Sequence, residues 1–201
     1  SMDLFNEQII QNILPYDGEA FYHGKILNAE KCGFYYQKLL EEIPWKNDKA
    51  IVFGKEYITK RKVAWFGDQE YQYTYSGITK KAHLWNSILM DLKQKIEEIS
   101  DTSYNSCLLN LYHSGEEGMG WHSDNEKTLL PNGAIASLTL GTARKFSFKH
   151  KKNKQKVDIF LENGSLLVMK GTIQRNWLHK LPTTKKVFTP RINLTFRTII
   201  L

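Results

Sequence analysis

The second half of the chain is a series of short β-prone runs separated by glycine or proline. These runs lie at 104–113, 134–140, 144–149, 157–161, 165–169, 176–181 and 191–200. Many short strands with turn signals between them are typical of a β-sandwich or barrel. We therefore expect an α+β chain that is mainly β, with a jelly-roll core over residues 104–201.

Two amphipathic helices are expected before this core. Asn28 can cap a helix whose apolar residues, from Cys32 to Ile43, recur at helical spacing, and Pro44 ends it. The segment 83–100 has the same periodicity and predicts a second helix. The length of 201 residues fits a single domain. In this view residues 1–103 form an N-terminal extension packed outside the core.

The positive charge of the chain is concentrated in its C-terminal half. The net charge is +7, and residues 101–201 contribute 15 basic and 7 acidic groups, or +8. The run from Arg144 to Lys156 holds seven lysines and arginines and no acid. Such a run favours a polyanionic partner through phosphate contacts. A solvated lysine loop that aids solubility is the alternative.

Other features bound the environment of the protein. No run approaches the ~18 apolar residues of a membrane span, so we expect no membrane partner. Cys32 and Cys107 are too few for a disulfide scaffold, which favours a reducing compartment. No basic and apolar leader opens the sequence, and nothing in it indicates an obligate oligomer.

A candidate metal site begins at His122 and Asp124. Two residues apart in an extended segment, their side chains point to the same face. His179, in a predicted strand downstream, is the best candidate for a third ligand. Two histidines and one carboxylate on one face of an octahedron are the ligand set of non-haem Fe(II) oxygenases. Zinc is a competitor, although its sites favour cysteine or a third histidine.

The C-terminal run from Pro190 to Arg197 alternates strictly between polar and apolar residues. Arg191, Asn193, Thr195 and Arg197 would share one face. That face could be solvated. If it points inward, its guanidinium groups need an anion, because unpaired buried charge is costly. A small dicarboxylate suits the guanidinium fork. Together with iron ligands, this pattern indicates 2-oxoglutarate as cosubstrate.

These residues resemble the AlkB-type Fe(II)/2-oxoglutarate dioxygenases from about residue 50 to the C-terminus. The resemblance is carried by short segments in the order and spacing of that family. They are Asn110-Leu111-Tyr112, Gly120-Trp121-His122-Ser123-Asp124, Ile135 to Gly141, Gly164 to Met169, His179 and Pro190 to Arg197.

The resemblance implies a double-stranded β-helix that forms a single catalytic domain over residues 1–201. It implies that His122, Asp124 and His179 hold Fe(II) and are the catalytic ligands. It further implies that Arg191, Asn193 and Tyr112 bind the distal carboxylate of 2-oxoglutarate. Asn110 and Arg197 would hold the end near the metal. The cofactors would be Fe(II), 2-oxoglutarate and O2.

Within the family, the chain is similar to the branch that repairs duplex DNA. Ile51-Val52-Phe53-Gly54-Lys55 matches a hairpin that presents an apolar finger, here Phe53, to the base stack. Tyr73-Thr74-Tyr75-Ser76-Gly77 matches the segment that lines the methylated base, with Tyr73, Tyr75 and Ser76 as contacts. Arg61 is expected on the same substrate side. Lys185 and Lys186 match a basic loop that grips the opposite strand.

One position departs from the family pattern. Where many members place an acid after the metal aspartate, this chain has Asn125, followed by Glu126. Asparagine both donates and accepts hydrogen bonds, whereas a carboxylate only accepts them. We expect both residues near the base edge, with the choice among methylated adenine, methylated cytosine and etheno bases left open. Thr184 replaces the first basic residue of the Lys185 loop.

The resemblance implies direct reversal of N-alkyl lesions such as 1-methyladenine and 3-methylcytosine in DNA, with release of formaldehyde and succinate. The partner would be duplex DNA with a flipped base, because methylation weakens pairing and lowers the cost of flipping. Two alternatives are an RNA or protein demethylase on the same core, and a nucleic-acid-binding module without catalysis. We expect the protein in the cytoplasm of a bacterium or the nucleus of a eukaryote.

Overall fold

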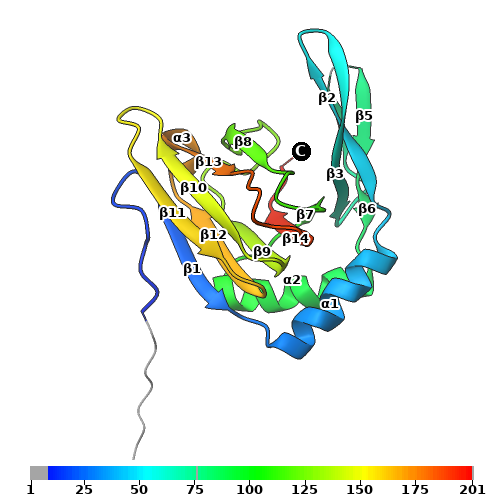
Figure 1. Ribbon diagram of the computed structural model, residues 1–201, viewed down its shortest axis with the longest axis horizontal. Helices are drawn as coiled ribbons and strands as arrows, with labels where there is room; N and C mark the ends of the chain where they lie inside the picture. Colours follow the sequence, from blue (N-terminus) through cyan, green and yellow to red (C-terminus); the bar gives the residue numbers. More distant parts are fainter. Residues whose placement is uncertain (1–8, 76, 201) are drawn as a thin grey trace, which may run out of the picture.

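The computed structural model describes residues 9–75 and 77–200. In these ranges the chain forms two facing β-sheets with helices on one outer side (Figure 1). The larger sheet has the strand order β1-β12-β9-β14-β7-β3-β2, and β6 pairs with β3. The smaller sheet has the order β11-β10-β13-β8, and β4 pairs with β5 in a separate ribbon. The expected jelly-roll core is confirmed.

The elements have the following bounds. The larger sheet contains β1 (Glu19–Lys25), β2 (Lys46–Val52), β3 (Lys55–Gly67), β6 (His83–Leu84), β7 (Ser106–Tyr112), β9 (Ile135–Gly141), β12 (Ser165–Lys170) and β14 (Arg191–Arg197). The smaller sheet contains β8 (Met119–His122), β10 (Arg144–His150), β11 (Lys156–Leu161) and β13 (Trp177–Leu181). The ribbon consists of β4 (Gln72–Tyr75) and β5 (Ile78–Lys81). The helices are α1 (Ala29–Glu42), α2 (Ser87–Ser100) and α3 (Ile173–Asn176).

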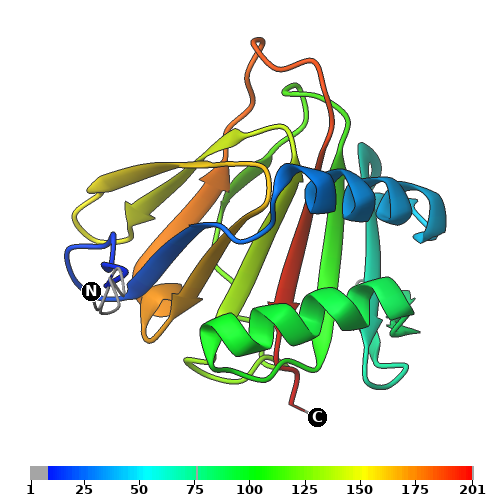
Figure 2. The ribbon, with the colours of Figure 1, turned by 90° about the horizontal axis from the view of Figure 1, so that it is seen from below.

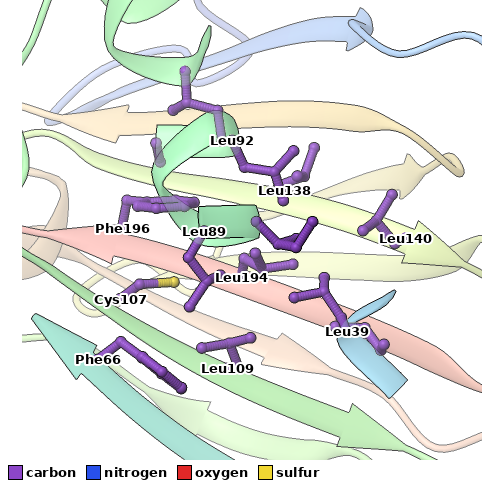
Figure 3. Packing of buried hydrophobic residues seen from close by; sticks show 14 of the residues in the cluster. Leu39, Phe66, Leu89, Leu92, Cys107, Leu109, Leu138, Leu140, Leu194 and Phe196 are labelled. Atoms are coloured by element: carbon purple, nitrogen blue, oxygen red, sulfur yellow. The ribbon is translucent and has the colours of Figure 1, made fainter. Parts of the chain in front are cut away.

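Helices α1 and α2 lie across the outer face of the larger sheet (Figure 2). Their apolar faces meet the outward side chains of β7, β9 and β14 in the main core (Figure 3). Burying a leucine there stabilises the fold by about 1.5–3 kcal/mol relative to leaving it exposed. The fully buried members of this core include Leu39, Leu89, Leu92, Leu109, Leu138, Leu194 and Phe196. This packing fixes the middle strands of the sheet, whose other face carries the candidate site.

The helix caps explain where the helices begin. The side chain of Asn28 accepts a hydrogen bond from the Lys31 backbone N–H at 2.9 Å, so the expected cap is confirmed. The prediction that the second helix starts at residue 83 is wrong. Asn86 caps α2 instead, and the two residues of β6 pair with the end of β3. None of the helices in the described ranges is long and apolar enough to cross a bilayer.

Strands from the N-terminal half extend the larger sheet. β1 pairs with β12 at one edge, and β3 pairs with β7 on the other side. No strand was expected in β1, because His23 and Gly24 interrupt a short run of mixed polarity. The hairpins β2–β3 and β4–β5 correspond to the two recognition segments that the resemblance implies. In Figure 1, β2, β3 and β5 lie on the side of the molecule opposite β1.

Candidate metal centre and adjoining cavities

His122, Asp124 and His179 come together between the two sheets. Strand β8 pairs with β13 so that His122 lies opposite His179, and Asp124 follows two residues later. One ligand atom from each of the three side chains lies within 4.8 Å of the others. Asp124 and His179 are buried. Two imidazoles and a carboxylate in this arrangement fit the donor set of Fe(II).

Hydrogen bonds fix the orientation of this triad. The Nδ1–H of His122 donates to the Gly120 carbonyl across 2.7 Å, which leaves Nε2 with its lone pair free for a metal. The backbone N–H of Asp124 donates to Gln174 Oε1 at 2.9 Å. Ser123, between the two ligands, donates from its hydroxyl to the Trp177 carbonyl. The segment that carries the ligands is therefore held from both sides.

The electrostatics of the site keep His179 and Asp124 in the protonation states that a metal requires. Burial lowers the pKa of His179 to about 4, so its imidazole is neutral at physiological pH. Burial acts to raise the pKa of Asp124, but Arg197 and the two histidines outweigh it and hold that pKa below its ordinary value. Arg197 Nη2 lies 3.1 Å from Asp124 Oδ1. The carboxylate is thus ionised.

The polar face of β14 points into the space between the sheets. Arg191 is buried at 3% exposure, and its Nη2 donates to Thr139 Oγ1 at 3.0 Å. Its guanidinium carbon lies 5.7 Å from the ring centre of Tyr112. Within the described residues, the buried Nε atoms of Arg191 and Arg197 have no hydrogen-bond partner. Two buried guanidinium groups with unused donors fit an anionic ligand.

Arg191 and Tyr112 form the expected cradle for the distal carboxylate of 2-oxoglutarate, and burial shifts their pKa values in opposite directions. It lowers the pKa of Arg191 to about 10, which still leaves the guanidinium charged at neutral pH. It raises the pKa of the Tyr112 phenol, which therefore stays protonated and can donate a hydrogen bond. A charged donor and a neutral donor thus lie side by side, as recognition of a carboxylate requires.

The two amides of the expected cradle are already engaged. The side-chain nitrogen of Asn193 donates to Ser137 Oγ at 2.7 Å and to the Leu138 carbonyl at 3.2 Å. Its oxygen accepts from the Thr195 hydroxyl. Asn110 Oδ1 accepts from the guanidinium of Arg61. The roles of Asn193 and Asn110 toward 2-oxoglutarate stay predictions.

A cavity of about 880 Å³ opens beside Arg197, and none of the three triad residues lines it. Its walls come from the β2–β3 hairpin, the β4–β5 ribbon and the inner face of the larger sheet. Five expected site residues line it, namely Arg61, Tyr73, Asn110, Glu126 and Arg197. Its volume lies within the range of small-molecule pockets. A second cavity of about 390 Å³, on the other side of Arg197, is lined by Asp124 and Asn125.

The other expected substrate contacts lie outside the large cavity. Phe53 is fully exposed at the tip of the β2–β3 hairpin, so it does not pack under the turn. Tyr75 is 56% exposed at the end of β4 and is not a core aromatic. Lys185 and Lys186 are exposed in the loop between β13 and β14. Ser76 lies outside the described residues.

The basic run from Arg144 to Lys156 is only partly a surface feature. Arg144 is buried, and its guanidinium donates to the carbonyls of Ser114, Glu117 and Pro182. The expected patch of seven basic side chains therefore does not include Arg144, and the prediction is wrong for this residue. An arginine at the start of a central strand can satisfy loop carbonyls that no strand partner reaches.

The lysines of the run and of β13 gather around one tryptophan. The Nζ atoms of Lys149, Lys180 and Lys156 lie 4.4, 5.6 and 5.9 Å from the ring centre of Trp121. None of the three forms an ion pair with any described residue. This part of the run is a charged outer face of the smaller sheet, open to a polyanion or to solvent.

The sequence analysis did not identify two residues that contact the site, Gln174 and Asp48. Gln174 binds the backbone of Asp124 from α3, and Asp48 forms ion pairs with Arg61 and Lys80. Neither residue belongs to a recognisable sequence motif, because each contact joins segments that lie far apart in the chain. An acid inside the β2 run was the available signal for Asp48, because charged residues are depleted from strands.

Comparison with known proteins supports this reading of the site. A family model described as the 2OG-Fe(II) oxygenase superfamily matches residues 20–197. The alpha-ketoglutarate-dependent dioxygenase alkB homolog 3 of Bos taurus is 38% identical over 183 residues, covering 86% of this chain and 63% of the relative. The human DNA oxidative demethylase ALKBH2 is 36% identical over 177 residues, covering 83% and 68%. The chain thus spans somewhat less than two thirds of the alkB homolog 3 relative.

The fold is also that of a solved structure. The structure of OsALKBH1 superposes with a TM-score of 0.63 at 16% identity, covering 94% of this chain and 99% of the other. At that identity the likeness concerns the fold alone. The family model covers nearly the whole chain. The human relative ALKBH2 is 36% identical to this chain over 68% of the relative's length. The chain therefore belongs to the 2OG-Fe(II) oxygenase superfamily and is an AlkB-type member of it.

Proposed function

We propose that this protein removes N-linked alkyl groups from nucleobases in DNA, using Fe(II), 2-oxoglutarate and O2. The observation that carries the proposal is the triad of His122, Asp124 and His179 beside two arginines with unused donors, one of which, Arg197, lines a large cavity. The name of the relative DNA oxidative demethylase ALKBH2 supports the choice of substrate.

When bound, Fe(II) supplies the oxidation by O2 in which 2-oxoglutarate becomes succinate and CO2 and the alkyl carbon becomes hydroxylated. The hydroxymethyl group on the ring nitrogen would then leave as formaldehyde, its hydroxyl proton would be released, and the ring nitrogen would regain its lone pair. The residues of the chain bind and orient these components. His179 offers a neutral imidazole and Asp124 an ionised carboxylate, so neither of these two ligands has to lose a proton for iron to bind at neutral pH, and His122 would be the third ligand.

The arginines of β14 would hold 2-oxoglutarate. Arg191, buried beside Tyr112, offers a charged donor and a phenol to the carboxylate far from the metal. Arg197 lies against Asp124 and would meet the end of the cosubstrate nearest the metal. Both arginines are largely withdrawn from water, so each carboxylate contact is stronger than it would be at the surface.

The cavity would receive a base extruded from the duplex. Tyr73, on its wall, offers an aromatic ring for stacking, and Tyr75 lies at the outer end of the same strand. Phe53 and Gly54 form a two-residue hairpin loop in which both have positive φ, of 50° and 75°. A phenylalanine held in the left-handed region and fully exposed is consistent with a wedge that fills the gap left by a flipped base.

The test is turnover on oligonucleotides that contain 1-methyladenine or 3-methylcytosine, as single- and double-stranded DNA and as RNA. We expect demethylation of DNA with formation of succinate by the wild-type chain, and none by Asp124→Ala. Asp158→Ala, which removes an exposed aspartate of β11, is the matched control and should keep full turnover. Preference for RNA would replace the DNA assignment. Absence of succinate with every substrate would contradict the proposal.

A further inference from the structure

The pairing of β2 with β3 is interrupted by a bulge next to the large cavity. Asn47 pairs with Lys62, and the next pair in register is Lys49 with Ile58, so three residues of β3 lie opposite one residue of β2. Bulges are common beside active sites, where they redirect a side chain. The last residue of this bulge is Arg61, which lines the cavity.

Side-chain hydrogen bonds hold the bulge in one conformation. The backbone N–H of Asp48 donates to Thr59 Oγ1 at 3.2 Å, and the Thr59 hydroxyl lies 2.8 Å from the Arg61 carbonyl. The side-chain amide of Asn47 donates to the Thr59 carbonyl at 2.9 Å. Side chains therefore satisfy the Asp48 N–H and the carbonyls of Thr59 and Arg61, which the bulge removes from the strand ladder.

The carboxylate of Asp48 joins both recognition hairpins. Its Oδ2 accepts from Arg61 Nη2 at 2.8 Å, and its Oδ1 accepts from Lys80 Nζ of β5 at 2.7 Å. The side chains of Asp48 and Arg61 are only 19% and 11% exposed. The pair Lys49–Glu56, on the same hairpin, is about half exposed and spans 3.4 Å. Asp48 thus makes the partly buried ionic contact of this hairpin with Arg61, whereas Lys49–Glu56 is a surface pair.

The other edge of the Arg61 guanidinium reaches the sheet. Its Nη1 donates to Asn110 Oδ1 on β7, so one guanidinium bridges the hairpin and a central strand of the core. Burial acts to raise the pKa of Asp48, but the hydrogen bonds and charges of Lys80 and Arg61 outweigh it and hold that pKa below its ordinary value. This carboxylate therefore stays ionised. A charged pair with charged partners on two sides contributes more than an isolated surface pair.

We propose that Asp48 is a positioning residue of the nucleobase cavity. It holds Arg61 against Asn110 and, through Lys80, makes the β2–β3 hairpin and the β4–β5 ribbon close on the base as one unit. The inference rests on the proposed function for its substrate, but the coupling of the two hairpins is a property of the protein alone. Asp48 contacts neither metal nor cosubstrate and acts through Arg61.

The first test needs no substrate. Amide hydrogen exchange is measured on the full chain as wild type, Asp48→Asn and Glu56→Gln. We expect Asp48→Asn to raise exchange about tenfold in both β3 and the β4–β5 ribbon, the effect of losing about one charge-assisted hydrogen bond. Glu56→Gln, which removes only the surface pair, should leave the β4–β5 ribbon unchanged. Unchanged protection of that ribbon in Asp48→Asn would overturn the coupling.

The second test separates positioning from stability. We expect Asp48→Asn to raise KM for the methylated oligonucleotide about tenfold while KM for 2-oxoglutarate changes less than about twofold. Succinate should then form in excess over formaldehyde, because the misplaced base escapes hydroxylation. Lys80→Met should act in the same direction and be non-additive with Asp48→Asn. A tenfold loss of kcat in Asp48→Asn, with the KM values for the oligonucleotide and for 2-oxoglutarate both unchanged, would overturn the positioning role.

The two proposals fail in different ways. If the wild-type chain turns over no methylated oligonucleotide, the proposed function is contradicted, and hydrogen exchange still decides whether Asp48 couples the hairpins. If the wild-type chain is active and Asp48→Asn matches Glu56→Gln in exchange and in both KM values, the inference about Asp48 is contradicted while the function stands.

Discussion

Arg197 Nη2 lies 3.1 Å from Asp124 Oδ1, which joins the strand of the expected cosubstrate cradle to a candidate metal ligand. Arg197 is the last residue of β14, and Asp124 follows the end of β8, so this pair also connects the two sheets. The charge that lowers the pKa of Asp124 thus comes from the same arginine that we expect beside the ketoacid. We therefore expect metal binding and cosubstrate binding to be coupled through this ion pair.

The first prediction concerns this arginine. Arg197→Met should weaken 2-oxoglutarate binding at least tenfold and also raise the Fe(II) concentration needed for half-maximal turnover, since it leaves Asp124 without its partner. Removing one member of a buried charge pair costs about 3–5 kcal/mol. Arg175→Met, which removes an exposed guanidinium of α3, is the control. A change confined to 2-oxoglutarate would contradict the coupling.

Two other buried arginines should behave differently from each other. Arg191→Met should raise KM for 2-oxoglutarate strongly and lower the melting temperature much less than Arg144→Met does, because its guanidinium gives up one hydrogen bond, to Thr139, and its Nε has no partner among the described residues. Arg144→Met should lower the unfolding free energy by at least about 3 kcal/mol, because three loop carbonyls lose their donor. Thermal melts and 2-oxoglutarate titrations on both variants check this pair. Equal destabilisation by both would contradict the assignment.

The exposed ring at the hairpin tip gives a substrate prediction. Phe53→Ala should reduce repair of methylated duplex DNA about tenfold or more and affect single-stranded DNA much less, because only a duplex needs the gap of the flipped base filled. Phe160→Ala, which removes another exposed ring on β11, should change neither rate. Comparable losses on the two substrates would exclude a wedge role for Phe53.

The depressed pKa of His179 predicts how the metal-free protein responds to acid. Burial lowers this pKa to about 4 in the folded chain, from 6.5 in the unfolded chain. Between these values the unfolded chain binds more protons, so the unfolding free energy falls as pH falls from 6.5 toward 4. At pH 5 the loss from this group is at most about 2 kcal/mol.

Urea denaturation of the metal-free chain at pH 7 and pH 5 measures this loss. His179→Gln, which cannot protonate, should show a smaller decrease of the urea midpoint between the two pH values than the wild type. An identical decrease in both proteins would mean that His179 is not desolvated in the folded state.

The strands of the core were predictable because their signals are local. Alternation along Arg191 to Arg197 and turn residues between the runs define the strands, and the side chain of Asn28 defines the start of α1. The triad was predictable for a related reason, since a histidine and an aspartate two residues apart need only one partner strand. Helix α2 was placed four residues too early because the apolar spacing continues into β6, which pairs with β3 instead.

What could not be predicted depends on contacts between distant segments. The inward turn of Arg144 follows from three carbonyls in two loops, which no window of sequence contains. The same holds for Asp48, whose partners lie 13 and 32 residues away. The strand β1 forms only because β12 offers a free edge, so its weak pattern is outweighed by pairing in the folded sheet.

The central claim is that His122, Asp124 and His179 hold one ferrous ion beside the arginines of β14. The most direct measurement is anaerobic calorimetric titration of Fe(II) into the chain in the presence of 2-oxoglutarate. The account predicts one bound ion per wild-type chain and no binding at that site in Asp124→Ala or His179→Ala. Undiminished binding in either variant, or no binding by the wild type, would contradict it.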